Sequence, residues 1–182
     1  MEINEKELIK GCIKGDRHAQ EELYLQFSRS MYAICLRYTK AQQEAEDVLQ
    51  ESFIKVFKQI GNYKGDAPLV FWIKKIVINT ALNAQRSKLY LYPMVDVQDL
   101  KESSGQEREV ADYTMEELMT MVRALPASSQ VIFNLYAIEG YKHHEIAEML
   151  EISVGTSKSQ YSRAKFLLKE RMKDKNKKYG KG

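Results

Sequence analysis

The order of apolar and polar residues along this 182-residue chain follows a helical period in almost every segment. Apolar side chains recur at spacings of three and four, and no stretch alternates strictly between apolar and polar positions as a half-buried strand does. Glycine and proline fall mainly between the periodic segments, where they end helices. We therefore predict an all-α protein with helices, in chain order, over residues 4–14, 16–40, 43–60, 69–88, 115–124, 129–139, 143–150 and 155–173.

The helical pattern lapses between residues 93 and 112. This segment is polar and acidic, and it contains Ser103-Ser104-Gly105. Such a composition is typical of a flexible linker. We therefore predict two small helical domains, residues 1–92 and 113–182, joined by a linker over residues 93–112.

Composition narrows the cellular setting of the protein. The sequence starts with an acidic, polar segment, so no signal peptide is expected, and no apolar run approaches the length that spans a bilayer. The two cysteines, Cys12 and Cys35, lack the CxxC spacing of a zinc site. We expect a cytoplasmic protein without membrane insertion, in a compartment that keeps both thiols reduced.

The net charge of +3 is unevenly distributed. Residues 67–92 contain four Lys or Arg and no Asp or Glu, and residues 113–182 contain 12 Lys or Arg and 8 Asp or Glu. The acidic segment between these two basic blocks, residues 93–112, contains two Lys or Arg and six Asp or Glu. Two basic blocks indicate two surfaces for a polyanion, although a solvated Lys-rich surface with a basic tail explains the charge equally well.

The region from His143 onward has the pattern of a helix-turn-helix motif. A short helix, residues 143–150, precedes the turn Glu151-Ile152-Ser153 and a longer helix that starts near Gly155. Ala147 is small enough for a close crossing of the two helices. A helical hairpin unrelated to DNA is the alternative interpretation.

The second helix of this motif divides into two faces at 100° per residue. The inward face contains Ser157, whose hydroxyl can bond back to the carbonyl group of Ser153. In this motif the N-terminal half of the second helix enters the major groove, where basic and hydroxyl side chains contact bases and phosphates. The candidate DNA contacts are Lys158, Ser159, Ser162 and Arg163.

The predicted helix over residues 43–60 also has two distinct faces. Its apolar stripe is Ala45, Leu49, Phe53, Val56 and Ile60. The opposite face carries Asp47, Glu51, Ile54 and Lys58, flanked by Gln50. An aliphatic residue between carboxylates suits protein docking, but an ordinary solvated face looks the same.

A magnesium-dependent nuclease site from Glu44, Glu46, Asp47 and Glu51 is a further alternative, for which no second ligand cluster is obvious.

The predicted helix over residues 69–88 carries a polar stripe with an aromatic start. Asparagine disfavours helices and offers both a donor and an acceptor to a base edge, so two exposed asparagines suggest a binding role. Tyr63, in the preceding loop, can stack on an unpaired base, although packing against the core is the alternative for this ring and for Trp72. The stripe consists of Trp72, Lys75, Asn79, Asn83 and Arg86.

Three segments together resemble bacterial sigma factors of the extracytoplasmic-function group. Residues 125–168 resemble the region that reads the −35 promoter element, residues 44–57 the polymerase-binding helix, and residues 71–88 the helix that reads and melts the −10 element. The order and spacing match, and only the acidic linker separates the two regions. The resemblance covers roughly residues 5–172.

The resemblance implies a transcription initiation factor with no catalytic residues, metal or cofactor of its own. Its partners are core RNA polymerase, promoter DNA and an anti-sigma factor of the kind that commonly holds this group inactive. Ser157 and Gln160 depart from the valine and arginine that many members have, which leaves the −35 base preference open. A stand-alone helix-turn-helix regulator is the alternative function. The implied polymerase contacts are Asp47, Gln50 and Glu51, and the implied −10 contacts are Tyr63, Asn79, Asn83 and Arg86.

Overall fold

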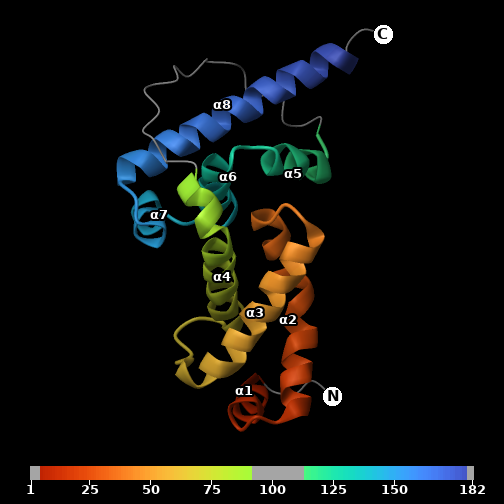
Figure 1. Cartoon of the computed structure of the whole chain (residues 1–182). Helices are drawn as coiled ribbons and strands as arrows, with labels where there is room; N and C mark the ends of the chain where they lie inside the picture. The colour runs from red at the N-terminus through yellow and green to blue at the C-terminus, as the bar shows by residue number, and fades with distance from the viewer. Residues whose placement is uncertain (1–4, 92–112, 180–182) are drawn as a thin grey trace. The chain divides into compact units, whose positions relative to one another are not determined.

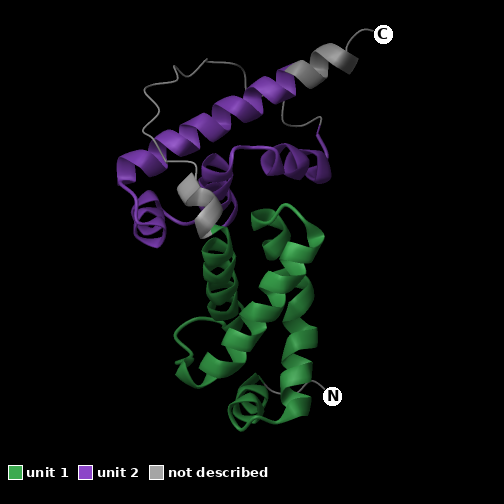
Figure 2. Cartoon of the chain, viewed as in Figure 1, with its two compact units in different colours: residues 1–86 green, residues 87–182 purple. Residues whose placement is uncertain are grey.

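The computed structural model describes residues 5–91 and 113–179, and the side chains of residues 5–85 and 113–173. Within these ranges every regular element is helical, which confirms the predicted all-α fold (Figure 1). The chain divides into two compact units, residues 1–86 and 87–182 (Figure 2). The predicted linker over residues 93–112 lies outside the described residues.

The described residues of unit 1 form four α-helices and one short 3₁₀ turn. The N-terminus of α2 is fixed by Asp16, whose side chain accepts a hydrogen bond of 2.8 Å from the backbone N–H of Ala19, as an N-cap does. Helix α2 packs against both α1 and α3. The elements are α1 (Glu5–Ile13), α2 (Arg17–Tyr38), α3 (Gln42–Gln59), η1 (Ile60–Asn62) and α4 (Leu69–Leu91).

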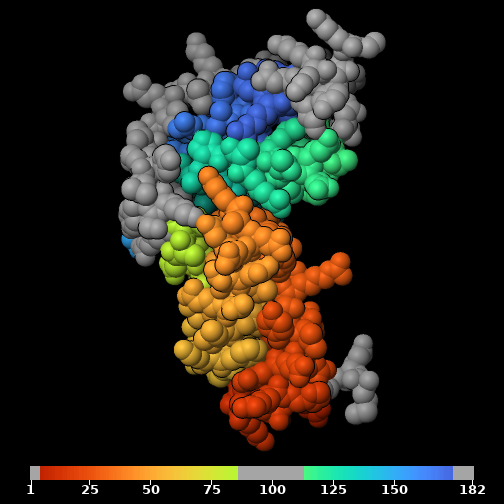
Figure 3. Space-filling model, turned by 45° about the vertical axis from the view of Figure 1, so that its right-hand side comes forward, coloured from red at the N-terminus to blue at the C-terminus, as the bar shows by residue number. Residues whose placement is uncertain are grey.

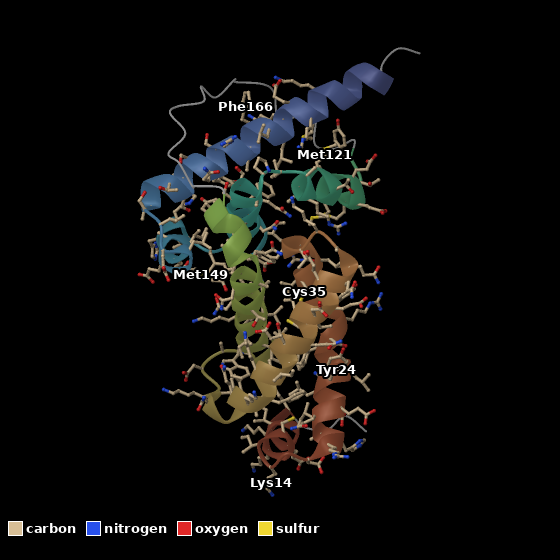
Figure 4. The ribbon with its side chains drawn as sticks, viewed as in Figure 1. Lys14, Tyr24, Cys35, Met121, Met149 and Phe166 are labelled. Carbon is tan, nitrogen blue, oxygen red and sulfur yellow. The ribbon has the colours of Figure 1, made fainter. Side chains whose placement is uncertain are left out.

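The core of unit 1 forms where the predicted apolar stripes meet. All five stripe residues from Ala45 to Ile60 are buried. The ring of Tyr24, labelled in Figure 4, packs edge-on against Phe53 with 4.8 Å between ring centroids. Both cysteines are buried free thiols, and burial raises the pKa of Cys35 to about 12. This thiol therefore stays protonated and unreactive at neutral pH.

Residues 113–179, the described part of unit 2 that follows α4, form four α-helices and one π-helical turn. The segment predicted as a single helix over 129–139 begins two residues earlier and widens into the π turn after Phe133. The last helix was expected to end at Lys173 but continues to Tyr179. The elements are α5 (Met115–Arg123), α6 (Ala127–Phe133), η3 (Asn134–Ile138), α7 (His143–Leu150) and α8 (Val154–Tyr179).

Helix α8 organises unit 2, because α5, α6 and α7 all pack against it (Figure 1). Its Ala164 is fully buried against Val122 and Leu125. Near its C-terminal part, Arg171 donates hydrogen bonds of 2.8 and 2.6 Å to the carbonyl oxygens of Met121 and Ala124. A cation on these last carbonyl groups stabilises the C-terminus of α5. Helix α8 is therefore anchored to α5 at two places along its length.

Candidate nucleic-acid and polymerase interfaces

The turn between α7 and α8 has the geometry of a helix-turn-helix. Glu151 adopts the left-handed conformation (φ 56°, ψ 45°), and the N–H of Ile152 donates to the carbonyl oxygen of Ala147 at 3.0 Å. The hydroxyl of Ser153 then accepts a hydrogen bond of 2.9 Å from the N–H of Thr156. One turn thus stops α7 and caps the start of α8. The helical pattern predicted the turn residues but not the left-handed backbone of Glu151.

The N-terminal half of α8 presents the predicted DNA contacts on its outer side. Lys158 is exposed, while Ser159, Ser162 and Arg163 are partly exposed. The hydroxyl of Ser159 donates to the carbonyl oxygen of Thr156 at 3.1 Å, which leaves its lone pairs to accept from a base or a backbone donor. All four side chains therefore lie on the accessible part of one helix.

Gln160 lies on the opposite, buried side of α8. Only 1% of its surface is exposed, and its carboxamide oxygen accepts hydrogen bonds from the hydroxyl groups of Ser128 (3.3 Å) and Ser129 (2.8 Å) in α6. A side chain in this position cannot touch a base in the described conformation. Gln160 lies three residues after Ser157 and four residues before Ala164, so the helical period places all three on the same face of α8. This spacing is the signal in the sequence that indicates its burial.

Ser157 connects α8 to the start of α7. It is fully buried, and its hydroxyl lies 2.9 Å from Nδ1 of His143, rather than on the carbonyl group of Ser153 as the sequence suggested. The imidazole stacks on Tyr136 with 4.3 Å between centroids and meets Tyr161 edge-on at 5.9 Å. Burial, and secondarily the positive charge of Lys158, lower the pKa of His143. This aromatic contact holds the two helices of the motif together.

In unit 1, α4 and the loop before it carry the predicted −10 contacts. Asn79 and Asn83 are exposed, one turn apart on the same face. Tyr63 is partly buried: its ring lies 5.7 Å from that of Trp72, and its hydroxyl donates to the carbonyl oxygen of Ala67 at 2.6 Å. The ring contact and the hydrogen bond together fix the loop against the first turn of α4. The side chain of Arg86 lies outside the described residues.

The outward face of α3 carries the predicted polymerase contacts. Asp47, Gln50 and Glu51 are exposed, as predicted, and Ile54 keeps 53% of its surface exposed. In the view of Figure 3, residues of α3 (orange to gold) form a broad part of the visible surface of unit 1. The face is therefore an accessible patch of carboxylates around one aliphatic side chain.

Lys55 is a member of this surface that the sequence did not single out. Its ammonium group lies 2.6 Å from a carboxylate oxygen of Glu51, one turn earlier in α3, and donates to the hydroxyl of Thr80 in α4 at 3.3 Å. The position of the Glu51 carboxylate is thus coupled to α4. Only the fold could reveal this contact, because residues 55 and 80 are far apart in the sequence.

The described part of the chain contains neither a group of metal-ligating side chains nor a membrane-spanning helix. Among those residues, no three His, Cys, Asp or Glu side chains are grouped closely enough to hold a metal ion. No helix within residues 5–91 or 113–179 combines the length and the apolar character needed to cross a bilayer.

Both units match known families. The family model described as Sigma-70 region 2 matches residues 23–89, and the one described as Sigma-70, region 4 matches residues 115–166. The chain belongs to the sigma-70 family of RNA polymerase sigma factors. As a sigma factor, it directs promoter-specific transcription initiation, and neither match supports a stand-alone regulator.

Similar sigma factors cover nearly the whole chain. It is 28% identical over 173 residues to RNA polymerase sigma-H factor of Pseudomonas aeruginosa, which covers 88% of this chain and 90% of the relative. It is 27% identical over 176 residues to ECF RNA polymerase sigma-E factor of Escherichia coli K12, a match that covers 90% of this chain and 92% of the relative. The two sigma regions and these relatives identify an alternative sigma factor of the extracytoplasmic-function type.

Solved sigma factors share the fold. One is the sigma factor RpoE from Bartonella quintana, in complex with the anti-sigma factor NepR. Its TM-score is 0.55 at 18% identity, covering 84% of this chain and 96% of that one. Another is CnrH in complex with the cytosolic domain of CnrY, with a TM-score of 0.52 at 18% identity. This match covers 92% of this chain and 96% of that one. At these identities the likeness concerns the fold alone.

Proposed function

We propose that this sigma factor reads the −35 element with the outer side of α8, through Lys158, Ser159, Ser162 and Arg163. The observation that carries this proposal is the division of α8 into a buried side and an exposed side. Ser157 and Gln160 are buried in hydrogen bonds within unit 2, whereas Lys158, between them, is exposed. Such a helix can enter a major groove without breaking its own packing.

The same proposal assigns the −10 element to unit 1. Asn79 and Asn83 offer paired donors and acceptors to bases of the melted strand, and Tyr63 supplies an aromatic ring in the loop before the same helix. Arg86 follows on the same helix and suits phosphate. What supports this assignment is the absence of any acidic residue between 67 and 92, the stretch that contains all of α4.

Asp47, Gln50 and Glu51 form the proposed contact with core RNA polymerase. The polymerase supplies the chemistry, so this chain needs no catalytic group, metal or cofactor. The proposed organisation is a polymerase-binding and −10 domain over residues 1–92, a linker over 93–112 and a −35 domain over 113–182. The factor then works in the cytoplasm beside its polymerase, and an anti-sigma factor is its proposed regulator, as the structural relatives are bound to such proteins.

Two alanine variants test the −35 assignment. We expect Lys158→Ala and Arg163→Ala each to weaken binding of the holoenzyme to −35 DNA by about 1–3 kcal/mol if the contact reaches a base. A phosphate contact instead weakens all sequences alike and lowers the salt dependence. Lys169→Ala is the matched control, because Lys169 is exposed on the same helix outside the proposed contact. Unchanged initiation by both test variants at −35-dependent promoters contradicts the assignment.

A further inference from the structure

Lys55 links the proposed polymerase face of α3 to helix α4. Its ammonium group lies 2.6 Å from the carboxylate oxygen Oε1 of Glu51 and 3.3 Å from the hydroxyl oxygen of Thr80. Thr80 is buried, with 2% of its surface exposed, whereas the side chain of Glu51 is 56% exposed. One cation therefore bridges a buried hydroxyl group of α4 and an accessible carboxylate of α3.

This bridge contributes little to the stability of the fold. Glu51 and Lys55 are four residues apart on α3, and a pair at this spacing with both side chains accessible to water stabilises a helix only slightly. The hydrogen bond to Thr80 adds a contact from a different helix, which a pair within one helix does not provide. The main consequence of the bridge is therefore expected in the position of the Glu51 carboxylate rather than in the stability of unit 1.

The order of charges along α3 acts on this carboxylate in the same direction. Asp47 is exposed one turn before Glu51, and like charges at this spacing repel each other. Lys55 follows one turn after Glu51, and a glutamate that precedes a lysine by four residues is the favourable orientation of such a pair. The Glu51 carboxylate is therefore repelled from the side of Asp47 and attracted toward Lys55.

The held carboxylate keeps acceptor capacity for a partner. Among the described residues, Lys55 is the one ion-pair partner of Glu51. A carboxylate has about four lone-pair sites on its two oxygens, so most of its acceptor sites stay available. A side chain that is held before binding loses less conformational entropy when a partner orders it. Lys55 therefore prepares Glu51 for an intermolecular contact.

We propose that Lys55, itself held by Thr80, is a positioning residue that presents the carboxylate of Glu51 to core RNA polymerase. This inference rests on the proposed contact between Glu51 and the polymerase. It assigns a part in polymerase binding to a buried hydroxyl group of α4, the helix that carries the proposed −10 contacts. Neither Lys55 nor Thr80 needs to touch the polymerase for this effect.

The first test is Thr80→Val, which removes the hydroxyl group but keeps the shape and the charge of the chain. The full-length variant is titrated with core polymerase in the absence of DNA. We expect the dissociation constant to rise about 2- to 12-fold, the range for ordering one flexible side chain on binding. The matched control is Thr39→Val, at a buried threonine whose hydroxyl donates to the carbonyl oxygen of Cys35, and it should bind like wild type. Wild-type affinity of Thr80→Val, or an equal loss in Thr39→Val, overturns the inference.

Substitutions of Lys55 separate positioning from net charge. Lys55→Met should also raise the dissociation constant about 2- to 12-fold, although it makes this face of α3 more negative. If the face attracted a basic surface by net charge alone, the same substitution would strengthen binding. Lys55→Arg keeps the cation and its donors and should stay within about twofold of wild type. Tighter binding by Lys55→Met would mean that Lys55 competes with the polymerase for Glu51, which contradicts a positioning role.

Double variants separate this inference from the function on which it rests. In a chain that carries Glu51→Ala, Thr80→Val should cause no further loss of affinity, because the carboxylate that it positions is gone. An equal loss with and without Glu51 means that Thr80 acts through the fold, and the inference is then wrong. If Glu51→Ala alone weakens binding while Lys55→Met and Thr80→Val do not, the positioning role fails and the polymerase contact stands. If Glu51→Ala binds core polymerase like wild type, the proposed contact of Glu51 fails as well.

Discussion

The carboxamide oxygen of Gln160 in α8 accepts a hydrogen bond from the hydroxyl of Ser129 in α6, with 2.8 Å between the oxygen atoms. Ser128 donates to the same atom at 3.3 Å, and all three residues are buried. Many sigma factors of this group have arginine at the position of Gln160. In this chain the position belongs to the packing of unit 2 rather than to the DNA-facing side of α8.

Removing that acceptor should destabilise unit 2. Gln160→Leu keeps the size of the side chain but leaves the two serine hydroxyl groups buried without their partner. We expect the free energy of unfolding to fall by about 1–3 kcal/mol, measured by urea denaturation. Adding Ser128→Ala and Ser129→Ala to Gln160→Leu should recover part of this loss, because the two serine donors that lost their acceptor are then removed as well. An additive loss in the triple variant contradicts this account, and Gln43→Leu, at an exposed glutamine, serves as the control.

The turn of the helix-turn-helix should accept a stabilising substitution. Glu151 is the only non-glycine residue with positive φ among the described residues, and this conformation costs an L-residue about 1–2 kcal/mol. Glu151→Gly removes the strain but makes the unfolded chain more flexible. We expect a net gain of about 0.5–1 kcal/mol in thermal or urea unfolding.

Its control is Glu148→Gly, in the exposed middle of α7. Glycine there should cost about 1 kcal/mol, because no strain is relieved. Equal losses from both substitutions contradict the interpretation of Glu151 as a strained position.

The contact between α1 and α2 requires a glycine. A Cβ atom at Gly11 would lie 2.6 Å from the Cβ atom of Ala19. Gly11→Ala should therefore destabilise unit 1 by about 1–3 kcal/mol despite the better helix propensity of alanine, as seen in urea unfolding. Ala19→Gly in the same chain should recover much of the overlap cost, and Gly61→Ala, with no atom within 4 Å, should be nearly neutral. Tolerance of Gly11→Ala alone contradicts this close approach.

Periodicity predicted the elements and buried faces well, because burial of one helix face leaves a regular signal in the sequence. The stripe from Ala45 to Ile60 is buried, and Asp47 and Asn79 are exposed, as predicted. The pattern could not predict contacts between helices. Two hydrogen bonds depend instead on the packing of residues that are distant in the sequence: Ser157 with His143, and Lys55 with Thr80.

His143 should make the stability of unit 2 depend on pH. Its pKa in the folded chain lies below the ordinary value of 6.5, so the unfolded chain binds more protons as the pH falls. The free energy of unfolding therefore decreases as the pH drops through 6.5 and levels off below the folded pKa. The charged or titratable groups around this imidazole are Lys158, Tyr136 and Tyr161.

Replacing the imidazole should remove this dependence. We expect urea unfolding of His143→Gln to vary less between pH 7.5 and 5 than that of the wild type, since the replacement does not titrate. His144→Gln, at the exposed neighbour, should retain the wild-type profile. If His143→Gln keeps the full acid-induced loss, another group is responsible.

Charge reversal on α3 tests the proposed polymerase face. Asp47→Arg and Glu51→Arg should change the free energy of unfolding by less than about 1 kcal/mol, because both side chains are exposed and an i,i+4 pair such as Glu51 with Lys55 contributes only about 0.3–0.5 kcal/mol. The double reversal should nevertheless weaken binding of core polymerase at least about 10-fold, because like charges across an interface cost several kcal/mol.

The comparison that decides this prediction is circular dichroism beside a core-polymerase binding assay. Ile54→Ser should also weaken binding, through lost apolar contact rather than charge, and its effect should therefore persist at high salt. Glu7→Arg with Glu21→Arg is the matched control, because it makes the same charge change at exposed positions of α1 and α2. If both double reversals weaken binding equally, net charge explains the effect. If the α3 variant folds and binds at wild-type affinity, the polymerase contact lies elsewhere on the chain.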